Sequence, residues 1–211
     1  MLARRLLQLY LGLVLYGASA GLIILSGLGN DPWDVLHEGA SRQTGIGTGL
    51  WVCIAGALVM LLWIPLRQRP GLGTLSNVVV IGLVLELCLA VVEPAREPAA
   101  RWTLLTSGVL LNGMATGLYI GARFGPGPRD GLMTGLAARG LSLRAVRTAI
   151  ELTVLAGGIA LGGTAGIGTV IYALAIGPLA HVFVPAFTVP PARAAAVAGP
   201  RASACAQAPC R

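Results

Sequence analysis

Long apolar stretches alternate with short polar breaks along most of the chain. Six of the stretches approach the roughly 20 apolar residues that a helix needs to cross a bilayer. They lie near 6–26, 49–65, 75–92, 102–122, 145–162 and 168–186. The fifth is the weakest, because Glu151 interrupts it and paired glycines lower its helix propensity. The pattern therefore predicts an all-α polytopic membrane protein with six transmembrane helices.

Two of the polar breaks share one motif. GLGNDPWDVL (27–36) follows the first apolar stretch, and FGPGPRDGLM (124–133) follows the fourth. A shift of 96 positions superposes Gly29 on Gly125, Pro32 on Pro128, Asp34 on Asp130 and Leu36 on Leu132. Further along, GLGT (71–74) returns as GIGT (166–169) at a shift of 95. The sequence therefore contains an internal repeat of two halves.

Each half of the repeat contains three predicted spans. The halves are residues 1–93 and 102–187, joined by an outer linker at 94–101, and the Ala/Pro/Arg-rich segment 188–211 is predicted to be a disordered cytoplasmic tail. Because three is odd, the second half must cross the membrane upside down relative to the first. Such inverted repeats are common among secondary transporters. A duplication retained only for stability is the alternative.

Each break motif predicts a short helix, one near 32–43 and the other near 128–139. Pro32 and Pro128 suit the first helical position, where no amide donor is needed. The glycines before them allow the chain to turn sharply. Both helices are too short to span a bilayer, so we expect them to be re-entrant or interfacial, one on each side of the membrane.

Ionisable residues in the motifs and spans are the candidates for a substrate or ion pathway: Asp34, Asp130, Arg129, Glu86, His181 and Glu151. Such groups are costly at membrane depth and usually face an interior cavity. A structural role is the alternative for several of them. Asp34 and Asp130 fall in the first turn of their helices, where carboxylates also serve as caps. Glu151 follows Arg147 by four residues, a spacing that suits an ion pair on a helix.

Glu86 and His181 occupy equivalent positions of the two halves at the shift of 95. A proton-relay or cation role is one interpretation of Glu86, and a satisfied structural carboxylate is the other. His181 suits either a pathway or simple packing.

Composition and charge agree with a membrane protein. Charged residues make up 11% of the chain, against about 25% in soluble domains, and the mean hydropathy is +0.80. With the N-terminus inside, twelve of the fifteen arginines fall in cytoplasmic segments and three, Arg42, Arg96 and Arg101, in outer loops. This bias predicts that both termini are cytoplasmic in a bacterial plasma membrane. Without basic runs interleaved with aromatics, we expect no nucleic-acid binding.

The N-terminus also has the outline of a cleavable signal peptide, because Arg4 and Arg5 precede an apolar core and Ala18-Ser19-Ala20. The repeat favours a retained span, since LYGASAGL (15–22) matches LNGMATGL (111–118) deep inside the chain.

Two segments resemble a known family. GLGNDPWDVLHEGASRQTGIGTG (27–49) and GPGPRDGLMTGLA (125–137) are similar to the YczE-like bacterial integral membrane proteins, grouped with YyaS and YitT. The resemblance covers about residues 5–187. It implies a polytopic plasma-membrane protein without naming a substrate.

Enzyme signatures are missing from the sequence. There is no HExxH motif, Walker loop or familiar Ser/His/Asp order, and the four cysteines are scattered. We therefore expect no enzymatic activity, no cofactor and no metal. Two functions stay open: a small-solute or ion transporter, and a noncatalytic membrane scaffold or accessory protein that supports another membrane-associated system. The expected partners are the lipid bilayer, an unknown solute or ion, and a second copy in a homodimer.

Overall fold

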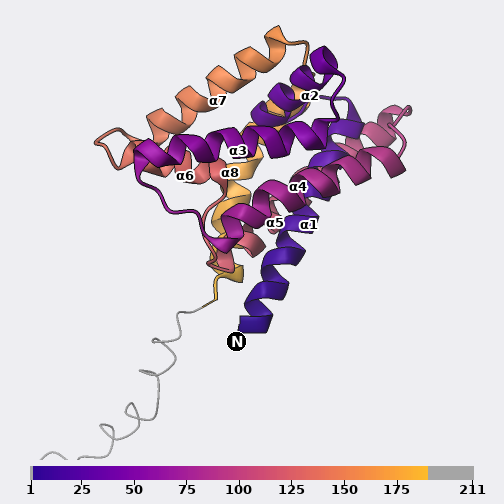
Figure 1. Ribbon diagram of the computed structural model, residues 1–211. Helices are drawn as coiled ribbons and strands as arrows, with labels where there is room; N and C mark the ends of the chain where they lie inside the picture. The colour runs from indigo at the N-terminus through magenta and orange to yellow at the C-terminus, as the bar shows by residue number, and fades with distance from the viewer. Residues whose placement is uncertain (1, 190–211) are drawn as a thin grey trace, which may run out of the picture.

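The computed structural model describes residues 2–189, and every regular element in that part of the chain is a helix (Figure 1). The helices are α1 (Leu2–Ser26), α2 (Pro32–Thr44), α3 (Thr48–Leu66), α4 (Leu72–Val91), α5 (Pro98–Gly121), α6 (Pro128–Ala137), α7 (Leu143–Ala160) and α8 (Ile167–Phe187). The two predicted short helices are α2 and α6. Apart from its first two residues, the predicted tail at 188–211 lies outside the described residues.

Five of these helices are long and apolar enough to cross a membrane: α1, α3, α4, α5 and α8. They correspond to five of the six predicted spans. The remaining predicted span is α7, which has 18 residues and carries Arg144, Arg147 and Glu151. These charges keep it below the hydropathy of the others, so a crossing by α7 stays a prediction.

The helix starts follow the sequence repeat. The first residues of α5 and α6 lie 96 positions after those of α1 and α2, and the first residues of α7 and α8 lie 95 positions after those of α3 and α4. The change from 96 to 95 therefore falls between the second and third helix of each half, in the loops that precede α3 and α7.

The two halves meet along α1 and α5, which run antiparallel through the core. Arg5 at the start of α1 donates from Nε to the carbonyl of Ala122 (3.0 Å) and from Nη2 to that of Arg123 (3.0 Å), just after α5. Arg101, 96 residues later, makes the equivalent two bonds from the start of α5 to carbonyls at the end of α1. Each end of the helix pair is thus held by one arginine.

Small residues let these two helices approach closely. A Cβ atom added at Gly12 would lie 2.7 Å from the backbone nitrogen of Tyr119. At the equivalent position, Gly108, an added Cβ would lie 2.7 Å from a side-chain carbon of Ile23. Leu9 and Leu13 of α1 are fully buried nearby and form the main core with residues of α4 and α5.

The last helix of each half begins on the break motif of the other half. The amide of Gly73 in α4 donates to the carbonyl of Phe124 (3.0 Å), and the amide of Gly168 in α8 donates to that of Leu28 (2.8 Å). The short helices cross over in the same way, because α2 packs against α7 and α6 packs against α3. The break motifs therefore lie at the junction between the halves.

One contact does not follow the repeat. α3 packs against α4, whereas α7 packs against α2 and α6 and does not lie on α8 in the same way. Figure 1 shows α7 at an outer edge of the molecule, apart from α4 and α5. At the centre of α4, a Cβ at Gly82 would lie 2.4 Å from the carbonyl oxygen of Gly49; at the equivalent Gly177 in α8, nothing lies within 4 Å. The second half therefore leaves an open space beside α8.

Candidate functional site

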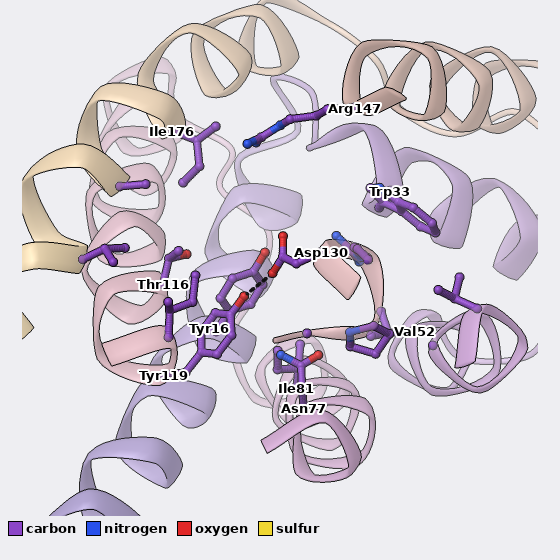
Figure 2. A pocket seen from close by; sticks show the side chains of 18 of the residues that line it. Tyr16, Trp33, Val52, Asn77, Ile81, Thr116, Tyr119, Asp130, Arg147 and Ile176 are labelled. Atoms are coloured by element: carbon purple, nitrogen blue, oxygen red, sulfur yellow. Dashed lines mark hydrogen bonds between the residues drawn. The ribbon is translucent and has the colours of Figure 1, made fainter. Parts of the chain in front are cut away.

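A cavity of about 450 Å³ occupies this space, and all eight helices contribute to its lining. Figure 2 shows Tyr16, Tyr119 and Thr116 on one side, Trp33 on the other, and Asp130 between them. A smaller pocket of about 80 Å³ shares part of this lining and extends to acidic residues of α2 and α7. The cavity combines apolar walls with a few polar groups, as small-molecule sites usually do.

The start of α2 is built by local sequence signals. Asp31 is the N-cap, and its Oδ1 accepts a hydrogen bond from the amide of Asp34 (2.8 Å), while Pro32 occupies the first turn. Gly29 before them has a φ of +116°, and a Cβ there would lie 2.5 Å from the amide nitrogen of Gly166. Only glycine fits this turn, which places the helix start beside the cavity.

Arg129 at the start of α6 crosses to the first motif. Its guanidinium lies 4.9 Å from the ring centroid of Trp33, which occupies the equivalent position of the repeat. Nη1 lies 3.7 Å from Oδ2 of Asp31, and Nη2 lies 3.7 Å from Oδ1 of Asp34. The two carboxylates are almost fully buried, and the arginine is one-quarter exposed. Arg129 is thus the cation that offsets both acids.

Burial controls the protonation of this cluster. It raises the pKa of Asp31 to about 6, with a further increase from Asp34 and an opposing effect of Arg129. Burial also raises the pKa of Asp34, again against Arg129. The pKa of His37 is lowered to about 3 by burial and then by Arg129. His37 is therefore neutral at pH 7, and its 3.1 Å contact from Nδ1 to Oδ1 of Asp34 is a hydrogen bond rather than an ion pair.

The other ring nitrogen of His37, Nε2, is buried and has no hydrogen-bond partner among the described residues. The indole nitrogen of Trp33 is in the same condition. Both residues line the cavity. With Asp34 ionised, Nδ1–H of His37 donates to its carboxylate and Nε2 is left as an acceptor. The indole N–H of Trp33 is a donor in every case.

Asp130 in α6 accepts a hydrogen bond on Oδ2 from the hydroxyl of Tyr119 (2.8 Å), as the dashed line in Figure 2 marks. The rings of Tyr119 and Tyr16 pack edge to face, with 6.0 Å between their centroids. In the described part of the chain, neither Asp130 nor Asp34 accepts a backbone amide through its side chain; in α2 that role belongs to Asp31. The two motif aspartates therefore contact side chains of the central cluster.

The remaining predicted candidates are distributed unevenly. His181 lines the cavity from α8. Glu151 lines the smaller pocket and accepts from Nε of Arg147 (2.9 Å), the ion pair that the four-residue spacing predicts. Glu86 does not line either space; its Oε2 accepts from the amide of Gly49 (2.7 Å) in the first turn of α3. Asp34 lies behind Arg129 and His37, outside the lining of both pockets. Pathway roles for these residues stay predictions.

Several site residues carry no local sequence signal. Tyr16, Tyr119 and Tyr172 lie in apolar helices, and only the packing of α1, α5 and α8 brings them to the cavity. Asp31 and His37 lie in the segment 27–49 that contains the first break motif, and this position was the one sequence feature that could have marked them as site residues.

The fold and site together define a multi-pass α-helical membrane protein with a central cavity that contains a few polar groups. A family model described as a family of unknown function (DUF6198) matches residues 3–185. An uncharacterized protein of Haemophilus influenzae is 42% identical over 176 residues, which cover 83% of this chain and 81% of that protein.

Two proteins of Bacillus subtilis are also similar. The uncharacterized membrane protein YczE is 32% identical over 79% of this chain and 83% of its own length. The uncharacterized protein YyaS is 31% identical over 83% of this chain and 90% of its own length. No solved structure matches the chain. The chain belongs to the DUF6198 family and is a YczE-like membrane protein, as the break motifs predicted.

Proposed function

We propose that the protein is a carrier that moves a small solute or ion through the central cavity. The observation that carries this proposal is the position of the cavity, where the starts of α2 and α6 meet between the two halves of the chain. Carriers commonly bind their substrates at such a junction, beside interrupted or shortened helices. Polar side chains such as Asp130 and Arg129 are costly at this depth unless they serve a ligand or each other.

The proposed topology is an inverted repeat of two three-helix halves with six crossings in the plasma membrane and both termini cytoplasmic. The antiparallel α1–α5 pair and the matched bonds of Arg5 and Arg101 support the inversion. The arginine distribution supports the orientation. In this orientation α2 lies towards the outer side and α6 towards the cytoplasm.

The unequal packing of the halves suggests how a carrier of this kind moves. In the structure α3 is closed on α4, and α7 is separated from α8 by the cavity. Because the halves are related by the repeat, the opposite state would close α7 on α8 near Gly177 and open α3 from α4 near Gly82. That exchange would close the present cavity and create an equivalent one beside Glu86. Such rocking of repeats is the usual route of alternating access.

A flux measurement tests the proposal. The purified full-length protein is reconstituted in liposomes. Mixtures of small radiolabelled amines, carboxylates and sugars are added outside the liposomes, or a pH-sensitive dye is enclosed in them. We expect saturable uptake of at least one class, and loss of that uptake in Asp130→Asn. Glu93→Gln, which removes a carboxylate from an exposed loop, is the matched control and should transport normally. Absence of flux for every class, with the protein folded, would favour the scaffold instead.

A homodimer is proposed as the working unit, because six spans are few for a monomeric carrier. Large apolar side chains of α8, including Leu174 and Val182, are exposed on the outside of the chain. They face either lipid or a second copy. Native mass measurement in lipid nanodiscs separates the two, and a monomer would contradict the dimer without affecting the carrier.

A further inference from the structure

We propose that the cavity binds a small organic ammonium ion, whose N–H groups reach the carboxylate of Asp130 and the free ring nitrogen of His37. This inference names the ligand class of the site proposed above. It rests on the proposed function only for passage across the membrane, because binding itself can be measured without transport.

The charges around the cavity favour a cation. Three carboxylates line the two pockets, those of Asp31, Asp130 and Glu151, and that of Asp34 lies behind them. Two guanidinium groups, those of Arg129 and Arg147, line the same pockets. Each guanidinium already has a carboxylate partner. Arg129 faces both acids of α2, and Arg147 is bonded to Glu151.

Asp130 is the carboxylate that is left over. In the described part of the chain no cationic group lies within 4.0 Å of it, and its one side-chain hydrogen bond comes from the Tyr119 hydroxyl to Oδ2. Arg147 lines the same space but interacts with Asp130 only from beyond that distance. A carboxylate in a cavity without a directly paired cation is costly unless it binds a cation or a proton. An anionic ligand would add a second negative charge beside it.

His37 supplies an independent indication. The residue is 1% exposed, lines the cavity, and leaves Nε2 without a partner. Burying an acceptor in this way costs free energy unless a donor reaches it. An ammonium group carries several N–H donors and can donate both to a carboxylate and to a neutral imidazole nitrogen, which a carboxylate or a quaternary ammonium cannot.

The size of the cavity selects an organic ion. A volume of about 450 Å³ is far larger than an inorganic cation needs and lies in the usual range for small-molecule pockets. Apolar side chains such as Val52, Ile81 and Ile176 line the same space and suit an alkyl chain. The unpartnered indole N–H of Trp33 offers a further contact to an oxygen on the ligand.

Calorimetric titration tests this inference on the full-length protein in lipid nanodiscs, with empty nanodiscs as the blank. The probes are butylammonium chloride and sodium butyrate, which match in size and differ in charge. We expect saturable binding of butylammonium at pH 7.5 and at least tenfold weaker binding of butyrate. Equal or tighter binding of butyrate would overturn the inference in the unmodified protein, whether or not any variant folds.

Variants then locate the site. Asp130→Asn should weaken butylammonium binding at least tenfold, Asp130→Glu should restore part of it, and Glu93→Gln should bind normally. Unchanged affinity in Asp130→Asn would also overturn the inference. Liposome flux separates this result from the carrier proposal: binding of butylammonium without flux of any probe removes the carrier and keeps the cation site. Flux of butyrate alone keeps the carrier and removes the cation site.

Discussion

Trp33 and Arg129 occupy equivalent positions of the two break motifs and lie against each other at 4.9 Å. Two arginines meeting there would repel, and two tryptophans would leave Asp31 and Asp34 without a cation. The divergence of the two copies instead produces a complementary pair, in which one motif provides the aromatic face and the acids and the other provides the charge. The planar shape of the guanidinium is as important as its charge, because a planar group can stack on the indole of Trp33 while its N–H groups face two carboxylates.

Arg129→Lys should therefore destabilise the folded protein, although the charge is kept. A lysine ammonium is a point charge that cannot stack or face Asp31 and Asp34 together. We expect a loss of about 1 kcal/mol in unfolding free energy for Arg129→Lys, and a loss of about 2–4 kcal/mol for Arg129→Ala, because two buried acids then lose their partner. Denaturant unfolding in detergent measures both, and equal stability of Arg129→Lys and the parent protein would contradict the stacking argument.

His37 should make stability depend on pH. Its pKa is lowered from 6.5 to about 3 in the folded protein by burial and by Arg129, so below pH 6.5 the unfolded chain takes up a proton that the folded protein does not. Stability from this residue is therefore lost as the pH falls from 6.5 towards 3. Asp31 acts in the opposite direction below pH 6, because its pKa is raised and the folded protein takes up the proton first.

Comparison with His37→Gln isolates the histidine, since Asp31, Asp34 and Arg129 are present in both proteins. The variant should gain on the parent by at most about 1.4 kcal/mol for each pH unit below 6.5. Thermal unfolding at pH 7, 6, 5 and 4 follows the difference. A difference that stays constant over this range would show that His37 is not held neutral.

At the scale of the helices, the sequence predicts most helix starts and turns and few of the contacts between helices. Pro32 and Pro128 mark the observed starts of α2 and α6, because proline and the glycine turns before it act within a few residues. The alternative role of Asp34 as a helix cap is not observed in α2, because the side chain of Asp31, three residues earlier, accepts the backbone amide. The Tyr119–Asp130 bond was not predictable, because it depends on how α5 lies against α6.

The weak fifth span shows the same limit. Glu151 marks α7 as different from the other spans, and the reason appears only in three dimensions. α7 does not pack along α8, and it contributes Arg147 to the cavity lining and Glu151 to the lining of the smaller pocket. Mean hydropathy alone therefore underestimates the ability of a helix to span the membrane when its charged residues line an internal cavity.

Gly82 and Gly177 should respond in opposite ways to the same substitution, although the repeat makes them equivalent. Gly82→Ala would place a Cβ 2.4 Å from the Gly49 carbonyl oxygen and from the Cys53 sulfur, so we expect a loss of about 1–3 kcal/mol as α3 is pushed from α4. Gly177→Ala meets nothing within 4 Å and should be neutral or stabilising by up to about 1 kcal/mol, because alanine favours a helix interior. Denaturant unfolding of the two variants checks this; equal losses would mean that α7 closes on α8 in solution.

At the scale of the whole molecule, the number of crossings decides where the C-terminus lies. Six crossings place both termini on the same side of the membrane, which the arginine distribution predicts to be the cytoplasm, and five, with α7 outside the membrane, place them on opposite sides. The contacts of the loop after α7 bear on this choice. The carbonyl of Thr164 accepts from the amide of Asn30 (3.1 Å), and the Thr164 amide donates to Glu38 (2.8 Å), so this loop is tied to the segment that follows α1.

The loop at 94–101 is tied to the same end of α1, because the amide of Ala95 donates to the carbonyl of Leu25 (3.1 Å). The loop before α7 is elsewhere: Arg139 donates to the carbonyl of Pro65 near the end of α3. With six crossings, loops 94–101 and 161–166 share one side of the membrane, the outer side in the proposed orientation, and the loop before α7 lies on the other.

Single cysteines at three exposed positions test this arrangement in a protein whose four native cysteines are replaced by alanine: Glu97→Cys, Leu141→Cys and Ala165→Cys. In intact cells, a membrane-impermeant maleimide should label Glu97→Cys and Ala165→Cys and should reach Leu141→Cys only after the cells are opened. If α7 does not cross, Ala165→Cys and Leu141→Cys will instead be labelled from the same side. Labelling of Glu97→Cys only after opening would contradict the proposed orientation. If Leu141→Cys were then also labelled only after opening, the inverted repeat itself would be contradicted, because α5 would not separate the two loops. Flux of the parent protein and of the cysteine-free protein, compared in the same liposomes, shows whether the replacements leave the fold intact.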